Sequence, residues 1–529
     1  MFTHFERSGN RIMLGMARNL FCLSALLVLA ACGGSNHKDS SGSEAPQRGT
    51  LLHSPPARVA SLSAADLAAA FGASPETQAT LQLTGAPKCR VDVHYIEYNT
   101  VGAKNEAATA SGALMVPAGI DPACQGGRPV VLYAHGTTTD RNFNIAAVKP
   151  ASGEPNKEGL LIALAFVSQG YIVVAPNYVG YDSSSLQYHP YLVAEQSANE
   201  MMDALAASRS ALPTMDAPTT TAGSKLFITG YSQGGHVAMA THRAMQAAGM
   251  QVTASAPMSG PYALSAFADA VFYGQVNGGA PIFTALLANS YQHAYGNVYA
   301  QPGDMFESPY ASTIENLLPS TTSRSDLYAQ GKLPSDQLFS ETPPDPAYAA
   351  YTPATEPAAL APLFARGFGP NHLITNSYRL AYLNDAQANP DGAFPNFTNG
   401  APPASPQHPL RQDLKTNDLR NWTPTAPVLL CGGDQDPTVY FMNTQLMQGY
   451  WAPTSAPVTV LDVDADPTGN DDPYKDFKDQ FDIAKQLAAA SAVAQGATDG
   501  GASAVLRDYH AGLVAPFCLA ATREFFDAH

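Results

Sequence analysis

The chain has 529 residues, of which 28 are lysine or arginine and 44 are aspartate or glutamate, so its formal net charge is −16. A surface this acidic argues against a nucleic-acid ligand and against attachment to anionic lipid by charge. The length is sufficient for one large hydrophobic core with an inserted domain.

Residues 1–31 have the layout of a secretory signal peptide. Three arginines precede an apolar run over residues 20–31, which is too short to span a membrane. The run ends in LAACG at Cys32, which resembles the lipobox of bacterial lipoproteins, where the cysteine thiol becomes lipidated. We therefore expect a lipid anchor at Cys32 and a place in the bacterial cell envelope, as an outer-membrane lipoprotein or a secreted protein. An ordinary signal peptide with a chance cysteine is the alternative.

The next segment has the composition of a linker. Residues 32–60 are rich in Ser, Gly, Pro and His and lack periodicity, so we expect a flexible tether. A helix is expected at residues 64–71. Apolar and polar residues alternate over residues 91–95, which predicts a strand, and residues 110–116 supply an antiparallel partner.

From residue 129 onward, buried strands alternate with helices. Strands are predicted at 129–134, 171–175, 225–229, 252–256 and 426–431, and helices at 158–168, 193–211, 236–248 and 514–526. Continuous apolar strands that alternate with helices predict an α/β fold with a mostly parallel central sheet and helices on both faces. Residues 61–261 and 426–529 would form this core. Residues 262–425 would be a large inserted cap, at the strand ends where open sheets bind ligands.

A nucleophile elbow lies between the predicted strand at 225–229 and the following helix. Its sequence is GYSQG, with Ser232 at the centre. Such a turn strains the serine backbone and needs glycine on either side, because side chains there would collide with the strand and helix. We assign the oxyanion donors to Thr137, in the HGT loop after the first buried strand, and to Gln233, which follows the nucleophile.

The acid and the base follow in the chain. The predicted strand at 426–431 runs into GGDQDPTV, so an acid in this loop can reach a histidine on the next strand. Asp434 and Asp436 are the candidate acids, and His510 is the candidate base. The order Ser, Asp, His is the one that α/β-hydrolases require. His135 and His236 precede the acid, so we expect structural or pocket-lining roles for both.

These motifs together resemble an α/β-hydrolase, and within that fold the secretory lipase family of bacteria and fungi. The resemblance covers residues 85–262 and 426–529. It rests on the HGT loop at His135, APNYVGYD at 175–182, GYSQGG at the elbow, SGPY at 259–262, GxxDxxV at 433–439, and His510. The GxxDxxV spacing favours Asp436 over Asp434 as the acid. One departure is Asn177, where the family often has aspartate.

The resemblance implies a hydrolase that cleaves carboxylic esters, of the lipase or esterase type, through an acyl-enzyme and without a cofactor. Ser232 would attack the carbonyl, His510 would take its proton, and Asp436 would orient the imidazole. A serine peptidase or a polyester depolymerase on the same fold is the alternative. The expected partner is a small-molecule or lipid ester, with membrane contact through the lipid anchor; the oligomeric state is left open.

The cysteines predict two disulfides in an oxidising compartment. Without Cys22 in the signal and Cys32 at the lipid site, four remain, and four cysteines allow three pairings. We favour Cys431 with Cys518, because one lies on the acid strand and the other in the helix after His510. Cys89 would then pair with Cys124. Four free buried thiols are the alternative.

An acidic segment at residues 462–472 raises the question of a calcium site, because alternating carboxylates supply oxygen ligands. Pro467 occupies a position where a calcium-binding loop between two helices requires glycine, and no glutamate closes the segment. A solvated acidic loop is therefore the expectation, and no metal is assigned.

Overall fold

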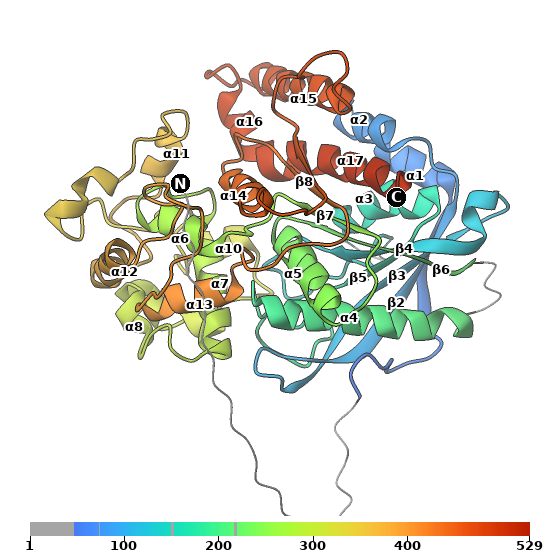
Figure 1. Ribbon diagram of the computed structural model, residues 1–529, viewed down its shortest axis with the longest axis horizontal. Helices are drawn as coiled ribbons and strands as arrows, with labels where there is room; N and C mark the ends of the chain where they lie inside the picture. Colours follow the sequence, from blue (N-terminus) through green and yellow to red (C-terminus); the bar gives the residue numbers. More distant parts are fainter. Residues whose placement is uncertain (1–46, 73–74, 150–152, 216–219) are drawn as a thin grey trace, which may run out of the picture. The chain divides into compact units, whose positions relative to one another are not determined.

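The computed structural model describes residues 47–72, 75–149, 153–215 and 220–529 (Figure 1). The signal peptide, Cys32 and the first part of the expected tether lie outside the described residues. The described residues belong to one compact unit.

The described residues form a nine-stranded sheet with the order β1-β2-β3-β5-β4-β6-β7-β8-β9. The strands are β1 Ala57–Leu62, β2 Arg90–Val101, β3 Ala107–Ala118, β4 Gly126–Ala134, β5 Ile172–Pro176, β6 Thr220–Tyr231, β7 Ala254–Met258, β8 Val428–Gly432 and β9 Val458–Asp462. Strands β4 to β9 are parallel to one another, whereas the pairs β1–β2, β2–β3 and β3–β5 are antiparallel. The mostly parallel sheet expected from the sequence is confirmed.

Helices cover both faces of the sheet, which explains why apolar residues of its central strands face both sides. On β4, Val131 and Tyr133 face one core, whereas Val130 and Leu132 face the other. The first core includes residues of α1 Ala64–Phe71, α3 Lys157–Ala165, α15 Lys475–Ala494 and α17 Ala515–Asp527. The second core includes residues of α4 Ala194–Ala211 and α5 Gln233–Ala247. The other helices of this part are α2 Pro75–Thr84, α14 Met442–Trp451 and α16 Ala502–Asp508.

The chain between β7 and β8 forms a mainly helical cap with a core of its own. Its helices are α6 Leu264–Phe272, α7 Ala280–Ala294, α8 Pro302–Met305, α9 Ser308–Ala311, α10 Arg324–Ala329, α11 Ala361–Arg366, α12 Asn376–Ala388 and α13 Pro409–Asn417. Figure 1 shows these helices grouped beside the carboxyl ends of the central strands. The Pro- and Gly-rich stretch before α13 is irregular, as its composition predicts.

Two expectations need correction. The tether was expected to reach residue 60, but residues 47–60 lie against the core. Here the amides of Gly49 and Leu52 donate to carbonyl groups of β2, and β1 pairs with β2. The base was expected on the strand after the acid, but that strand is β9. His510 instead lies in a π-helical turn, Tyr509–Val514, that joins α16 to α17. A short apolar run such as 504–506 does not distinguish strand from helix.

Candidate active site

The elbow after β6 holds Ser232 in a backbone conformation that favours glycine. Its φ is 61° and its ψ is −121°, and it caps the amino end of α5. A Cβ at Gly230 would lie 2.4 Å from the carbonyl oxygen of Gly234, and one at Gly234 would lie 2.0 Å from that of Ala134. Both glycines are therefore required by close backbone approach, and the strained turn directs the serine away from the sheet.

The structure brings Ser232, His510 and Asp436 together in one hydrogen-bonded chain. His510 Nε2 lies 2.8 Å from Ser232 Oγ, and His510 Nδ1 lies 2.6 Å from Asp436 Oδ2. Because the Asp436 carboxylate can only accept, Nδ1 carries the proton and Nε2 is the acceptor for the serine hydroxyl. This is the arrangement in which a histidine can act as a general base toward serine.

Asp436 is held more firmly than its neighbour Asp434. Its side chain is buried, and Oδ1 accepts hydrogen bonds from the amides of Thr438 and Val439 at 2.9 and 3.0 Å. Asp434 is exposed, and its amide donates to Asp462 of β9. The buried carboxylate that contacts the histidine is therefore the one favoured by the sequence spacing.

The loop after β4 passes beside Ser232. A Cβ at Gly136 would lie 3.9 Å from the Cβ of Ser232. The next residue, Thr137, hydrogen-bonds through Oγ1 to the phenol of Tyr191 at 2.9 Å. Thr137 and Gln233 both line the pocket at Ser232, which is the location expected for oxyanion donors.

The histidines that precede the acid are buried and do not join the hydrogen-bonded chain. His135 stacks on Tyr178 with ring centroids 4.0 Å apart, and His236 Nε2 lies 3.0 Å from the carbonyl oxygen of Asn417. Burial lowers the pKa of His135 and of His236 to about 4, so both are neutral at pH 7. The structural roles expected for them agree with these contacts.

Three side chains outside the predicted set, those of Tyr133, Glu158 and Tyr509, make hydrogen bonds next to the site. Glu158 of α3 is partly buried and accepts hydrogen bonds from the phenol of Tyr133 and the amide of Gly136, at 2.8 and 3.1 Å. Burial raises the pKa of the Glu158 carboxyl. Tyr509 receives the amide of Gln435 and donates to Asp464. No sequence motif marks these residues, because each acts through a contact between distant segments.

An apolar pocket extends from Ser232 into the cap. Most of its lining is aliphatic or aromatic, and none of the described residues that line it is charged. The lining residues are Thr137, Tyr191, Leu192, Ser232, Gln233, Pro261, Leu264, Phe267, Ala268, Val271, Phe272, Asn277, Ala280, Phe283, Thr284, Leu287, Ala288, Met305, Leu410, Leu414, Thr438 and Val439. Such a lining suits an apolar group next to the reacting carbon.

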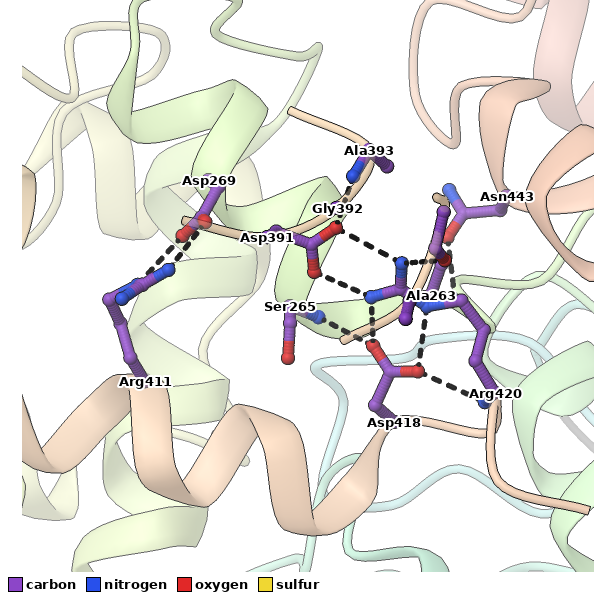
Figure 2. A network of polar contacts seen from close by, with 12 residues as sticks. Ala263, Ser265, Asp269, Asp391, Gly392, Ala393, Arg411, Asp418, Arg420 and Asn443 are labelled. Atoms are coloured by element: carbon purple, nitrogen blue, oxygen red, sulfur yellow. Dashed lines mark hydrogen bonds and ion pairs between the residues drawn. The ribbon is translucent and has the colours of Figure 1, made fainter. Parts of the chain in front are cut away.

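A buried ionic network fixes the start of α6, which forms one wall of this pocket (Figure 2). Arg420 makes ion pairs with Asp391 and Asp418, and all three side chains are at most 1% exposed. Asp418 also accepts the amide of Ser265 at 3.0 Å. Nearby, Arg411 makes a two-pronged contact with Asp269. An unpaired charge at these buried positions would be costly, and the mutual pairing of the side chains offsets that cost.

Both disulfides favoured by the sequence are present in the structure. Cys431 at the end of β8 is bonded to Cys518 in α17, with Cα atoms 5.5 Å apart. Cys89 is bonded to Cys124 before β4, with Cα atoms 5.6 Å apart. The first bond links the strand that leads to the acid with the helix that follows the base.

The carboxylates of the acidic segment at 462–472 engage neighbouring groups. Asp464 pairs with Lys485 of α15, and Asp472 pairs with Lys478 at 2.8 Å. Asp462 accepts the amide of Asp434. Over the described residues, no group of three or more acidic, histidine or cysteine side chains has an arrangement suited to a metal ion.

No helix in the described part of the chain is both long enough and apolar enough to cross a membrane.

Comparison with known proteins agrees with this fold. The model of the secretory lipase family matches residues 155–300, which include the elbow. The ligand-bound rice cell wall degrading esterase LipA from Xanthomonas oryzae is 26% identical, with a TM-score of 0.63. The alignment covers 90% of this chain and 98% of that one. A structure from Legionella pneumophila is 21% identical with a TM-score of 0.58, covers 83% and 98% of the two chains, and shares the fold. No curated protein sequence matches the chain. The chain is therefore a lipase-like protein with the α/β-hydrolase fold.

Proposed function

We propose that the protein is a serine hydrolase that cleaves carboxylic esters through an acyl-enzyme. The observation that carries this proposal is the hydrogen-bonded chain from Ser232 through His510 to the buried Asp436. An isolated serine hydroxyl is a weak nucleophile at neutral pH, and it becomes effective when a positioned base can take its proton.

In the proposed mechanism, Ser232 Oγ attacks the ester carbonyl carbon while His510 Nε2 takes the hydroxyl proton. Asp436 stabilises the resulting imidazolium and keeps Nδ1 protonated. When the tetrahedral intermediate collapses, the carbon–oxygen bond to the alcohol breaks and His510 returns the proton to that oxygen. Water then attacks the acyl-enzyme with His510 again as the base, which releases the acid and restores Ser232.

We assign the oxyanion contacts to the backbone amides of Thr137 and Gln233. Gln233 begins α5, so its amide lies at the positive end of the helix dipole. The Gly136 amide next to Thr137 is occupied by Glu158, which holds the loop in place from the other side. Loss of one such donor costs about 3 kcal/mol of transition-state stabilisation in comparable sites.

The character of the pocket supports an ester with an apolar acyl or alcohol group. A peptidase that recognises a substrate amino terminus needs a carboxylate to pair with it, and the described pocket lining contains none. The similar esterase from Xanthomonas oryzae is described as degrading the rice cell wall. The substrates to test are therefore small esters, lipid esters and a polymeric ester.

The test combines active-site labelling with a substrate panel. The purified protein should react with a fluorophosphonate probe at Ser232, and the Ser232→Ala variant should not. Nitrophenyl esters, an emulsified triacylglycerol, a polyester film and peptide amides should then be compared by kcat/KM. Faster turnover of peptide amides than of every ester would contradict the proposal.

We further propose that the mature protein begins at a lipidated Cys32, as the lipobox resemblance implies. The two disulfides and the family match fit a secreted protein. Expression in a bacterial host with labelled palmitate should give a labelled, membrane-associated protein, and Cys32→Ser should abolish the label. An unlabelled mature protein that begins at another residue would identify an ordinary signal peptide instead.

A further inference from the structure

The loop that carries the acid is hydrogen-bonded to the cap. The cap turn between α6 and α7 provides the contacts. The amide of Gly278 donates to the carbonyl oxygen of Pro437 at 2.9 Å, and the phenol of Tyr440 donates to the carbonyl oxygen of Gln275 at 2.8 Å. Asn277, which directly precedes Gly278, supplies a side-chain contact.

Asn277 is hydrogen-bonded to Thr438, the residue whose amide binds Asp436. Its Nδ2 donates to the carbonyl oxygen of Thr438 at 2.7 Å, and the amide of Thr438 donates to Asp436 Oδ1 at 2.9 Å. The Asn277 side chain is buried, with 8% of the residue exposed. The amide of Thr438 therefore orients Oδ1 of Asp436, while the cap binds the carbonyl oxygen of the same residue. Asp436 uses its second oxygen for His510.

Helix α6 is also tied to the acid loop at its opposite end. The amide of Ala263, just before α6, donates to Asn443 Oδ1 at 3.1 Å, and Nδ2 of Asn443 donates to the carbonyl oxygen of Tyr440 at 3.0 Å. The same end of α6 is held by Asp418 in the ionic network (Figure 2). Both ends of α6 are therefore hydrogen-bonded, directly or through Asn443, to the segment after the acid.

We infer that Asn277 is a positioning residue for the carboxylate of Asp436, and that the cap is thereby a fixed part of the triad's support. This inference rests on the proposed function, in which Asp436 is the acid. Loss of the Asn277 contact would free the peptide unit that joins the Thr438 carbonyl to the Val439 amide to tilt, and this Val439 amide donates to Asp436 Oδ1 at 3.0 Å. The Oδ1 contact would then weaken, and the carboxylate would turn away from His510 Nδ1. Displacement of about 1 Å at a catalytic group costs about 100-fold in rate.

Two variants of the full chain test this role. Asn277→Ala removes the side-chain amide, and Asn277→Asp keeps the shape but replaces the donor with an acceptor. Each should lower kcat by about 10- to 100-fold with KM nearly unchanged, on nitrophenyl acetate and nitrophenyl octanoate alike. The matched control is Asn289→Ala, because Asn289 is equally buried in α7 and donates to the carbonyl oxygen of Leu318, far from the acid loop. Its kcat should stay within about 3-fold of wild type, since its contact lies inside the cap.

A double substitution separates positioning from other roles. If Asn277 acts through the acid, then Asn277→Ala should cause little further loss in an Asp436→Asn background. A full additional loss in that background would overturn the inference. So would a loss confined to the octanoate ester, because this would indicate a direct contact between Asn277 and a long substrate.

Labelling distinguishes a failure of this inference from a failure of the proposed function. The rate of fluorophosphonate labelling at Ser232 should fall in both Asn277 variants, with their melting temperatures close to wild type. A wild-type protein that is not labelled would overturn the proposed function and the inference together. Labelling of Asn277→Ala and Asn277→Asp at the wild-type rate would overturn the inference alone.

Discussion

The phenol of Tyr231 donates a hydrogen bond to the main-chain carbonyl oxygen of His510. Tyr231, directly before Ser232, is therefore bonded to a residue that lies 279 positions further along the chain. His510 lies in a π-helical turn, in which the regular helical pairing of backbone groups is interrupted. Tyr231 binds one carbonyl of this turn, so it restrains the position of the His510 imidazole relative to Ser232.

Tyr231→Phe removes this contact while keeping the aromatic ring. We expect kcat to fall by about 10-fold, because the turn can then shift and the Ser232–His510 distance is no longer fixed. Steady-state kinetics at constant temperature and a melting curve would measure the effect. Tyr262→Phe is a suitable control, since Tyr262 is an equally buried phenol in the core. An unchanged kcat in Tyr231→Phe would show that helix packing alone holds the base.

Ser232→Ala and His510→Ala should each abolish measurable ester hydrolysis, while the melting temperature stays close to wild type. The two residues act in one proton transfer, so the double variant should be no slower than either single variant. The comparison needs an assay that can resolve residual rates above spontaneous hydrolysis. Losses that multiply in the double variant would indicate that serine and histidine work independently.

Asp436→Asn should lower kcat by about 10⁴-fold, because the amide would favour the wrong imidazole tautomer. The matched control is Asp434→Asn, two residues away in the same loop, which changes an exposed carboxylate. That variant should keep nearly full activity, and nitrophenyl ester kinetics would compare the two. A larger loss in Asp434→Asn than in Asp436→Asn would move the catalytic acid to the exposed position.

The sequence predicted the parts of the site that are local. The elbow around Ser232 has a fixed spacing because one tight turn requires it, and the parallel sheet follows from apolar strands that alternate with helices. The loop after β8 presented two acids, and motif spacing favoured Asp436, the one that the structure buries against His510.

The remaining features depend on contacts between distant segments. Glu158, Tyr231 and Asn277 each support the site through a backbone group far away in sequence, and single side chains carry no periodic signal for such contacts. The helical setting of His510 was missed for a different reason. The apolar run before it is too short to show a strand or a helix period, and the turn that holds His510 contacts α15, α16 and α17, which the run does not reveal.

Removal of the Cys431–Cys518 bond should reduce both stability and activity. The bond closes a loop of 87 residues, so the chain-entropy model gives a loss of about 4.6 kcal/mol in the free energy of unfolding when both cysteines become alanine. Because it joins the strand before the acid to the helix after the base, kcat should also fall. The Cys89/Cys124 double variant is the control, and it should lose stability with kcat unchanged. Denaturant unfolding and kinetics well below the melting temperature would measure both effects. Equal kcat in the two double variants would show that the first bond has no part in aligning the triad.

The buried carboxyl of Glu200 in α4 should make stability depend on pH. Burial raises the pKa of Glu200 to about 8, although Gln196 donates a hydrogen bond to it, and the nearby Arg48 pairs with Asp203 instead. In the unfolded chain the carboxyl loses its proton near its ordinary pKa of 4.5. Between about pH 4.5 and pH 8 the folded state therefore binds the extra proton. The contribution of Glu200 to the free energy of unfolding therefore falls as pH rises through that window, by up to about 1.4 kcal/mol per pH unit.

Glu200→Gln removes this titration and keeps the shape of the side chain. The variant should gain stability relative to wild type as pH rises from 5 to 8. The difference should level off above pH 8, where the wild-type carboxyl is ionised in both the folded and the unfolded state. Guanidinium unfolding at pH 5, 6.5, 8 and 9 would measure the difference. The control is Glu195→Gln, which changes an exposed carboxylate on the same helix and should leave the pH profile unchanged. A difference between Glu200→Gln and wild type that stays constant over the window would mean that Glu200 is already ionised in the folded protein at pH 5.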